Sequence, residues 1–177
     1  MPPVPLPAES SLPEGVRLTP LQVHDDPRGS FTEIFRSAWD TGVEPLQWNA
    51  VASAPSVMRG VHVHVLHDDY LVVVAGSATV GLRDLRAGAT SPGLTIDLTG
   101  REPVGITIPH GVAHGFVFHE QSLHVYSTST YFNTDDELGC RWDDPGLEIP
   151  WSVSEVTLSP RDQALPGLQE LRAALPW

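Results

Sequence analysis

Residues 59–75 read RGVHVHVLHDDYLVVVA, an alternating segment followed by an apolar one. In the first part, valines alternate with His62 and His64, so a β-strand here puts the valines on one face and both imidazoles on the other. The arginine that begins the segment adds a fixed positive charge suited to phosphate or carboxylate. We therefore expect a strand that presents Arg59, His62 and His64 to a shared space. The alternative is a surface strand whose polar face is solvated.

Most of the chain is predicted to form short strands separated by turns. Gly and Pro punctuate nearly every gap, and Gly76-Ser77 has the pattern of a hairpin turn between two strands. Only residues 165–175 show a helical period. Many short strands are typical of an antiparallel sandwich or barrel. We expect an all-β fold with one short C-terminal helix and strands at 16–23, 31–35, 47–51, 71–75, 78–85, 94–98, 104–108, 115–119 and 123–126.

Size and charge limit the function classes. The 177 residues suit one domain, expected at residues 16–177 after a proline-rich, extended arm at residues 1–15. A net charge of −12 argues against binding nucleic acid or anionic membranes. All ten basic residues are arginine, which excludes a lysine Schiff base. The single cysteine, Cys140, and the lack of a signal-peptide or membrane-span pattern predict a cytoplasmic protein.

Two histidine-bearing motifs resemble those of the cupin superfamily. They read His62-x-His64-x4-Asp69-x6-Gly76 and Gly105-x3-Pro109-x-Gly111-x2-His114. The match is partial, because an aspartate stands where the superfamily has glutamate and Phe118 replaces an asparagine. The resemblance implies an antiparallel jelly-roll barrel. In a metal-dependent cupin enzyme, a divalent ion would be held by His62, His64, Asp69 and His114.

A second resemblance, to the dTDP-4-dehydrorhamnose 3,5-epimerase family, covers about residues 16–168 in family order. Residues 26–33 resemble the family's D-x-R-G-x-F-x-E, and residues 58–62 resemble its L-R-G-L-H. Residues 108–116 match I-P-x-G-x-A-H-G-F, and residues 158–162 are similar to L-S-x-K-D. This resemblance implies an isomerase of deoxysugar biosynthesis, in secondary metabolism, that acts on a dTDP-linked 4-keto-6-deoxy sugar.

The chemistry implied by this resemblance is proton abstraction beside a ketone. The 4-keto group acidifies the C–H bonds at C3 and C5, a base forms the enolate, and an acid returns a proton to the opposite face. His62 matches the family's base, Asp162 the carboxylate that pairs with it, and Tyr126 the acid. The resemblance implies no nicotinamide and no metal cofactor.

The resemblance also implies a set of substrate-binding residues. Arg28 and Arg59 match positions that bind the diphosphate, which suits the fork of a guanidinium group. The family implies a homodimer that exchanges N-terminal strands. Sugar- or nucleotide-contacting positions are matched by Phe31, Glu33, Gln47, Asn49, His114, Tyr131 and Glu137.

Two positions depart from the family pattern. His64 stands where the family has glutamine, and Asp69 aligns with a lysine that donates to the 4-keto oxygen. A carboxylate opposes an enolate, and losing such a donor costs about a hundredfold or more in rate. We retain His64 and Asp69 as candidate site residues and leave open whether C3, C5 or both are epimerised.

Three other functions stay open. The Arg-Gly-x-His-x-His segment is similar to that of sugar 3,4-ketoisomerases, which use paired histidines to move protons. A metal-dependent cupin would use the four ligands named above. A non-catalytic sugar-binding relative would have lost its activity together with the family lysine.

Overall fold

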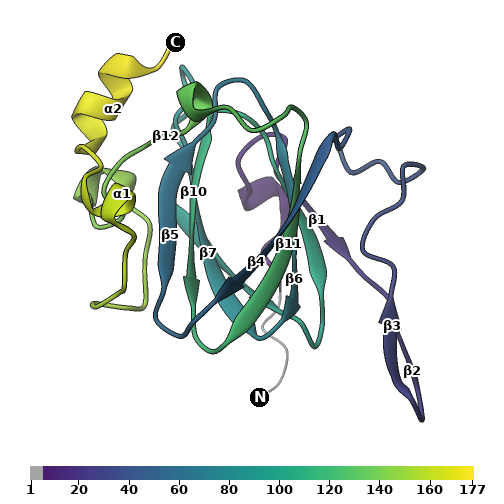
Figure 1. Cartoon of the computed structure of the whole chain (residues 1–177). Helices are drawn as coiled ribbons and strands as arrows, with labels where there is room; N and C mark the ends of the chain where they lie inside the picture. The colour runs from purple at the N-terminus through teal and green to yellow at the C-terminus, as the bar shows by residue number, and fades with distance from the viewer. Residues whose placement is uncertain (1–5) are drawn as a thin grey trace.

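The computed structural model describes residues 6–177, and it contains two facing antiparallel sheets, a projecting hairpin and a C-terminal helical segment (Figure 1). The first sheet has the strand order β1-β9-β6-β11-β4, and the second has the order β12-β5-β10-β7-β8. Neighbours within both sheets run antiparallel. This confirms the predicted all-β jelly roll with its short C-terminal helix.

The element bounds are as follows. The first sheet contains β1 (Arg17–Pro20), β9 (Val104–Ile108), β6 (Asp69–Ala75), β11 (Ser122–Thr128) and β4 (Gln47–Ser53). The second contains β12 (Leu138–Gly139), β5 (Met58–Val63), β10 (Val112–Phe118), β7 (Ser77–Asp84) and β8 (Leu94–Thr99). The hairpin consists of β2 (Val23–Asp26) and β3 (Gly29–Thr32). The helices are η1 (Glu9–Ser11), η2 (Thr134–Asp136), η3 (Pro145–Leu147), α1 (Pro160–Gln163) and α2 (Leu168–Ala174).

The alternating segment lies in β5 as far as Val63, with His64 directly after the strand, and its two faces have different surroundings. Val61 and Val63 are fully buried and pack with Leu168 of α2. His62 and His64 line a cavity. Figure 1 shows the C-terminal helices beside this strand. Because the valine face is covered and the histidine face borders the cavity, the surface-strand alternative is wrong.

Gly60 allows β5 to lie close to β10. It has a φ of +111°, and a Cβ atom there would lie 2.7 Å from the carbonyl oxygen of His114 and 2.8 Å from Cα of Gly115. A larger residue would therefore push the strands apart. The register that this close approach permits pairs His62 with His114. Two imidazole-bearing positions far apart in the sequence thus become neighbours.

The hairpin predicted at Gly76-Ser77 is wrong. The strands on either side of Gly76 belong to different sheets, because β6 pairs with β9 and β11 whereas β7 pairs with β10 and β8. Gly76 has a φ of +77°, and a Cβ atom there would lie 2.6 Å from the carbonyl oxygen of Gln121. The glycine turns a corner between sheets, and its local turn pattern does not reveal which strands pair.

The N-terminal region contains the predicted arm and the projecting hairpin. Residues 1–5 of the arm expected at 1–15 lie outside the described residues, and Leu12 is buried in the core between the sheets. Pro27 and Arg28 form the turn between β2 and β3, and Figure 1 shows the hairpin extending away from the barrel.

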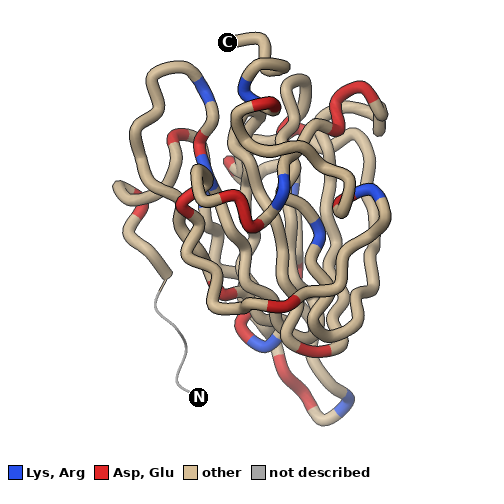
Figure 2. Tube along the Cα trace, turned by 90° about the vertical axis from the view of Figure 1, so that its left-hand side faces the viewer, with Lys and Arg blue, Asp and Glu red and all other residues tan. Residues whose placement is uncertain are grey.

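Charged residues are scattered over the molecule. Figure 2 shows acidic residues in many loops, with the few basic residues dispersed among them. No helix among residues 6–177 has both the length and the apolar character needed to cross a membrane.

Candidate active site

A cavity of about 510 Å³ lies between the two sheets. This volume suits a small-molecule ligand. Strands β4, β6 and β11 contribute residues from the first sheet, β5 and β10 contribute residues from the second, and the segment leading into α1 adds more. Ten of the predicted site residues line it: Gln47, Asn49, Arg59, His62, His64, Asp69, His114, Tyr126, Glu137 and Asp162.

His62 and Asp162 form a hydrogen-bonded pair in the cavity wall. Nε2 of His62 lies 2.7 Å from Oδ1 of Asp162. Ser159 caps α1 by accepting the amide N–H of Asp162 at 3.1 Å, which fixes the carboxylate's position. Burial raises the pKa of Asp162, but the hydrogen bond and charge of His62 outweigh it and hold the pKa below its usual value. The pair therefore combines an anion with an imidazole that reaches the cavity.

Tyr126 lines the cavity from the other sheet. It lies on β11, opposite Asn49 of β4 and Leu71 of β6, whereas His62 lies on β5. Burial and the nearby carboxylates of Asp69 and Glu137 raise the pKa of the Tyr126 phenol. The phenol is therefore protonated at neutral pH and can act as an acid across the cavity from the imidazole.

Two arginines line the cavity with their positions fixed by hydrogen bonds. Arg59 donates to Oγ of Ser53 at 3.0 Å and to the carbonyl oxygen of Ala52 at 3.2 Å. Arg161 donates to the carboxylate of Glu137 at 3.0 Å. Such preorganised cations suit a diphosphate. Arg161 was not predicted as a site residue, although its position beside Asp162 is a signal that sequence reasoning can use.

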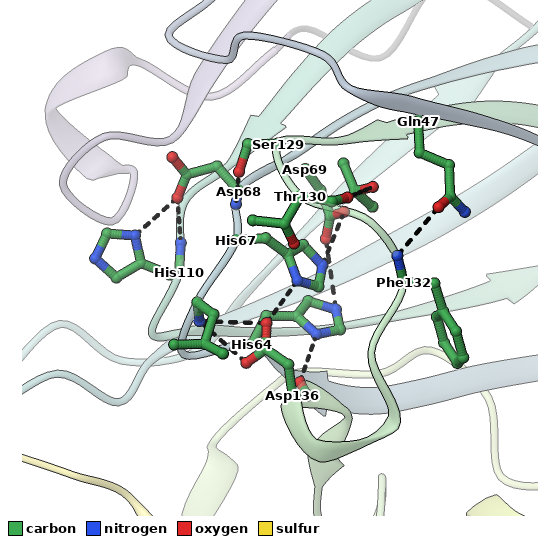
Figure 3. Close-up of polar contacts among 12 residues, drawn as sticks. Gln47, His64, His67, Asp68, Asp69, His110, Ser129, Thr130, Phe132 and Asp136 are labelled. Atoms are coloured by element: carbon green, nitrogen blue, oxygen red, sulfur yellow. Dashed lines mark hydrogen bonds and ion pairs between the residues drawn. The ribbon is translucent and has the colours of Figure 1, made fainter.

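A buried polar cluster joins β6, η2 and the loop between β5 and β6 (Figure 3), and it reaches His114 of β10. Asp136, 1% exposed, accepts hydrogen bonds from the amide of Val65 at 2.6 Å and from Nδ1 of His67 at 2.6 Å. The His64 ring stacks on that of His67, with centroids 4.0 Å apart. Oδ2 of Asp69 lies 3.5 Å from Nε2 of His64. His67 and Asp136 were not predicted as site residues.

Burial perturbs the titration of this cluster. It lowers the pKa of His114 to about 4, so that this imidazole is neutral at pH 7. Burial also lowers the pKa of His67, but the carboxylates of Asp69 and Asp136 outweigh burial and raise the pKa above its usual value. Within residues 6–177, two groups of three side chains have ligand atoms within 4.8 Å of one another, as metal ligands do: His64, Asp69 and His114, and His64, His67 and Asp136.

Four predicted substrate-binding residues lie outside the cavity of their own chain. The side chain of Arg28 is 89% exposed and pairs with Asp26, and Phe31 is 63% exposed on the projecting hairpin. Glu33, just after the hairpin, pairs with Arg36 at 2.7 Å. Tyr131 is 69% exposed. The structure therefore does not place these four residues in the cavity that His62 lines in the same subunit.

Comparisons with known proteins identify the family. The family model for dTDP-4-dehydrorhamnose 3,5-epimerase matches residues 9–170. The spore coat polysaccharide biosynthesis protein SpsL of Bacillus subtilis is 34% identical over 146 residues, covering 79% of this chain and 97% of SpsL. The dTDP-4-dehydrorhamnose 3-epimerase of Streptomyces niveus is 33% identical over 176 residues, covering 91% of this chain and 83% of that protein.

A solved structure supports the same conclusion. NovW, a 4-keto-6-deoxy sugar epimerase from the novobiocin biosynthetic gene cluster of Streptomyces spheroides, superposes with a TM-score of 0.83 at 27% identity. The superposition covers 97% of this chain and 88% of NovW. The shared fold and the match over most of the sequence confirm the family predicted from the motifs. This chain belongs to the dTDP-4-dehydrorhamnose 3,5-epimerase family, whose members are isomerases.

Proposed function

We propose that the chain epimerises a dTDP-linked 4-keto-6-deoxyhexose at C3, C5 or both, in deoxysugar biosynthesis. The observation that carries the proposal is the His62–Asp162 pair at 2.7 Å, facing a cavity that Tyr126 lines from the opposite sheet. A base and an acid on opposite walls are what inversion of a carbon centre requires.

His62 is the base in this proposal. Because the Asp162 carboxylate accepts the hydrogen bond from Nε2–H, the neutral ring carries its lone pair on Nδ1. That lone pair takes the proton from the carbon beside the ketone, and the imidazolium that forms is stabilised by the adjacent anion. The electrons of the broken C–H bond move onto the carbonyl oxygen as an enolate.

Tyr126 is the acid. Its raised pKa keeps the phenol protonated before the reaction, so it can donate a proton to the enolate carbon from the face opposite His62. The configuration of that carbon is inverted when the new C–H bond forms on this second face. The lining carries Gln47, Asn49 and Glu137 for the sugar and Arg59 for the diphosphate.

The proposal includes a homodimer in which the β2–β3 hairpin of each subunit completes the partner's site. Arg28 and Phe31 are exposed on this hairpin and lie outside the cavity of their own chain. Exchange of the hairpin would bring a second arginine and an aromatic ring to the nucleotide. The proposed location is the cytoplasm, which fits a chain with a single, buried cysteine.

Proton NMR of dTDP-4-keto-6-deoxyglucose in D2O tests the reaction. We expect the enzyme to remove the C3 or C5 proton signal, and the signal that is lost identifies the carbon. The matched variants are His62→Asn and His124→Asn, since both imidazoles line the cavity but only His62 pairs with Asp162. Undiminished exchange in the His62 variant, or no exchange by the native protein, contradicts the proposal.

Mixed dimers test the exchange of hairpins. Arg28→Ala and His62→Asn each damage both sites of a homodimer. In a mixed dimer with exchanged hairpins, one site has an intact His62 from one subunit and an intact Arg28 from the other. We therefore expect the mixture to recover activity that neither variant has alone. If subunits mix without recovery, each chain builds its own complete site.

A further inference from the structure

We propose that His64, Asp69 and His114 bind a protonated amino group on the sugar, so that the substrate is a nucleotide-linked amino deoxysugar. This inference rests on the proposed function and narrows its substrate class. All three side chains are more than nine-tenths buried, and all three line the cavity. Asp69 comes from the first sheet and His114 from the second, and the polar atoms of the three residues lie within 4.8 Å of one another.

The two rings present hydrogen-bond acceptors to Asp69. Nδ1 of His64 lies 3.0 Å from the carbonyl oxygen of Asp136. Nδ1 of His114 lies 3.1 Å from that of Val112. A carbonyl oxygen only accepts, so Nδ1 carries a proton in both rings. Nε2 of each ring lies 3.5 Å from Oδ2 of Asp69, whereas a charge-assisted N–H···O bond is roughly 2.7–2.9 Å long. We therefore assign both Nε2 atoms as unprotonated acceptors.

Asp69 also has an oxygen atom without a partner (Figure 3). Its Oδ1 is buried and makes no hydrogen bond with any residue from 6 to 177. Nε2 of His67 lies 3.6 Å from this oxygen, which is beyond hydrogen-bond length. Leaving a buried carboxylate oxygen unpaired is costly. A bound group that donates hydrogen bonds would remove this cost, whereas an acceptor such as a ketone oxygen would not.

Other histidine–aspartate contacts in the same protein provide an internal standard. His62 and Asp162 lie 2.7 Å apart, as partners that share a proton do. His67 and Asp136 lie 2.6 Å apart and form a second pair of this kind. The contacts of Asp69 with imidazoles, at 3.5–3.6 Å, are all longer. The hydrogen-bonding capacity of Asp69 is therefore left for a ligand.

An ammonium group matches this set of acceptors better than a hydroxyl group does. The cavity wall presents three acceptor atoms, namely Oδ1 of Asp69 and Nε2 of His64 and of His114. A hydroxyl group donates one proton, whereas an ammonium group donates three and adds a positive charge opposite the carboxylate. Arg59 and Arg161, which also line the cavity, donate to other partners within the part of the chain that the structure describes.

The acceptor atoms lie beside the proposed base and acid. His114 is the direct cross-strand neighbour of His62. On β6, Asp69 precedes by two residues Leu71, which pairs with Tyr126 on β11. Two residues along a strand span roughly 7 Å and point to the same face. Around a 4-keto carbon, the ketone oxygen only accepts and C6 of a 6-deoxy sugar is a methyl group. We therefore place the amino group at C3.

An ammonium group at C3 would also act on the enolate. The enolate oxygen belongs to the adjacent carbon, so one N–H can donate to that oxygen while the others donate to Asp69 and to an imidazole. Asp69 alone would place negative charge near the oxygen and oppose its formation. A donor held in place before the reaction stabilises a developing oxyanion. The substrate thus supplies its own donor for the enolate.

Isothermal titration calorimetry of the full-length protein tests this subsite without turnover. The ligands are dTDP-3-amino-3,6-dideoxyglucose and dTDP-6-deoxyglucose, which contain no ketone and differ only in the amino or hydroxyl group at C3. We expect the native protein to bind the amino sugar about 10–100-fold more tightly, the range for a hydrogen bond to a charged group. A chelator in the buffer excludes divalent ions. Equal affinity for the two ligands, or tighter binding of the hydroxyl sugar, overturns the proposal.

Three variants test which residues produce the preference. Asp69→Asn removes the charge but keeps the size of the side chain, and we expect it to lose the preference for the amino sugar. Asp135→Asn, at an exposed position, is the matched control and should retain the preference. His114→Phe keeps an aromatic ring but removes one acceptor, so it tests the site independently of Asp69 and should show a smaller preference. Circular dichroism identifies a variant that fails to fold. A native preference in both Asp69→Asn and His114→Phe overturns the site.

Proton exchange in D2O then separates the subsite from the epimerase. We expect exchange of dTDP-3-amino-4-keto-3,6-dideoxyglucose to be roughly 10–100-fold faster than that of dTDP-4-keto-6-deoxyglucose, because the amino group adds a donor to the enolate oxygen. Exchange of both sugars at equal rates, with equal binding of the two C3 ligands, supports the proposed function and overturns the amino subsite. Tighter binding of the amino sugar without exchange of either substrate supports the subsite and contradicts the epimerase.

Discussion

The cavity contains two histidine–aspartate regions that differ in spacing and exposure. In the first, His62 and Asp162 lie 2.7 Å apart, and the His62 side chain is 19% exposed. In the second, His64 and His114 each lie 3.5 Å from Asp69, and all three side chains are less than 10% exposed. The same residue types therefore form a pair that shares a proton and a group that does not.

This difference shows why residue type alone does not assign a role. A base must be within reach of a substrate, and a neighbouring anion stabilises its charged form; His62 lines the cavity and has Asp162 as that anion. The buried group instead directs two ring nitrogens at one carboxylate oxygen. We therefore expect substitutions in the first region to change chemistry and those in the second to change ligand binding or stability.

The largest effect should come from removing the base. His62→Asn leaves Asp162 without its imidazole partner, and we expect proton exchange in D2O to slow by about 10²–10⁴-fold, the range for loss of a general base. Proton NMR with saturating substrate measures this rate. His124→Asn removes a buried imidazole from the opposite wall of the same cavity and is the matched control. If the His62 variant exchanges protons as fast as this control, His62 is not the base, and the two regions do not differ in the way proposed.

Removing the acid should separate two steps of the reaction. Tyr126→Phe keeps the ring but loses the phenol proton, so His62 can still form the enolate and return deuterium to the same face. We expect epimer formation to fall by about a hundredfold while solvent exchange continues. Mass spectrometry of the recovered sugar, combined with NMR of its stereochemistry, measures both. Equal loss of exchange and inversion would contradict this assignment.

The sequence predicts the fold class because its strands are short and its polar and apolar residues alternate. Val61 and His62 show this best, since one packs under α2 and the other lines the cavity. The crossover at Gly76 was not predictable, because a positive φ serves a hairpin and a corner between sheets equally well. Strand partners depend on distant segments, which a local pattern does not contain.

Site residues were predictable where a motif carries them. His62, Tyr126 and Asp162 come from three segments and reach one cavity, as the family motifs imply. Asp136 had no such signal, because its role depends on a loop that places it under the amides of Val65 and Leu66. Long-range hydrogen bonds of this kind follow from the fold and leave no periodicity in the sequence.

Substitutions in the buried polar cluster should change the stability of the folded protein. Asp136→Asn removes a carboxylate that accepts from two backbone amides and from His67, and its amide group cannot replace all three bonds. We expect a loss of about 1–3 kcal/mol in the free energy of unfolding, the cost of unpaired buried groups. Urea denaturation measures it. Asp135→Asn, at the exposed neighbouring position, should change stability little. Equal stability of the two variants would show that Asp136 does not hold the cluster.

The smallest effect concerns the pH dependence of the first region. The pKa of Asp162 is lower in the folded protein than in the unfolded chain, so its stabilising contribution is present above the unfolded value near 3.9 and is lost as pH falls through the folded value. Asp162→Asn lacks this titration. At neutral pH we expect it to be about 1 kcal/mol less stable, the difference between a charged and a neutral hydrogen bond.

Urea denaturation at neutral pH and below pH 3.9 tests this prediction. The stability gap between the native protein and Asp162→Asn should narrow on acidification, because the native carboxylate becomes protonated and resembles the amide. Asp143→Asn, whose side chain is 57% exposed, is the control and should follow the native curve. A gap that stays constant or widens at low pH would mean that the charge of Asp162 does not stabilise the folded pair. Asp162 would then not be the anion that stabilises the charged form of His62.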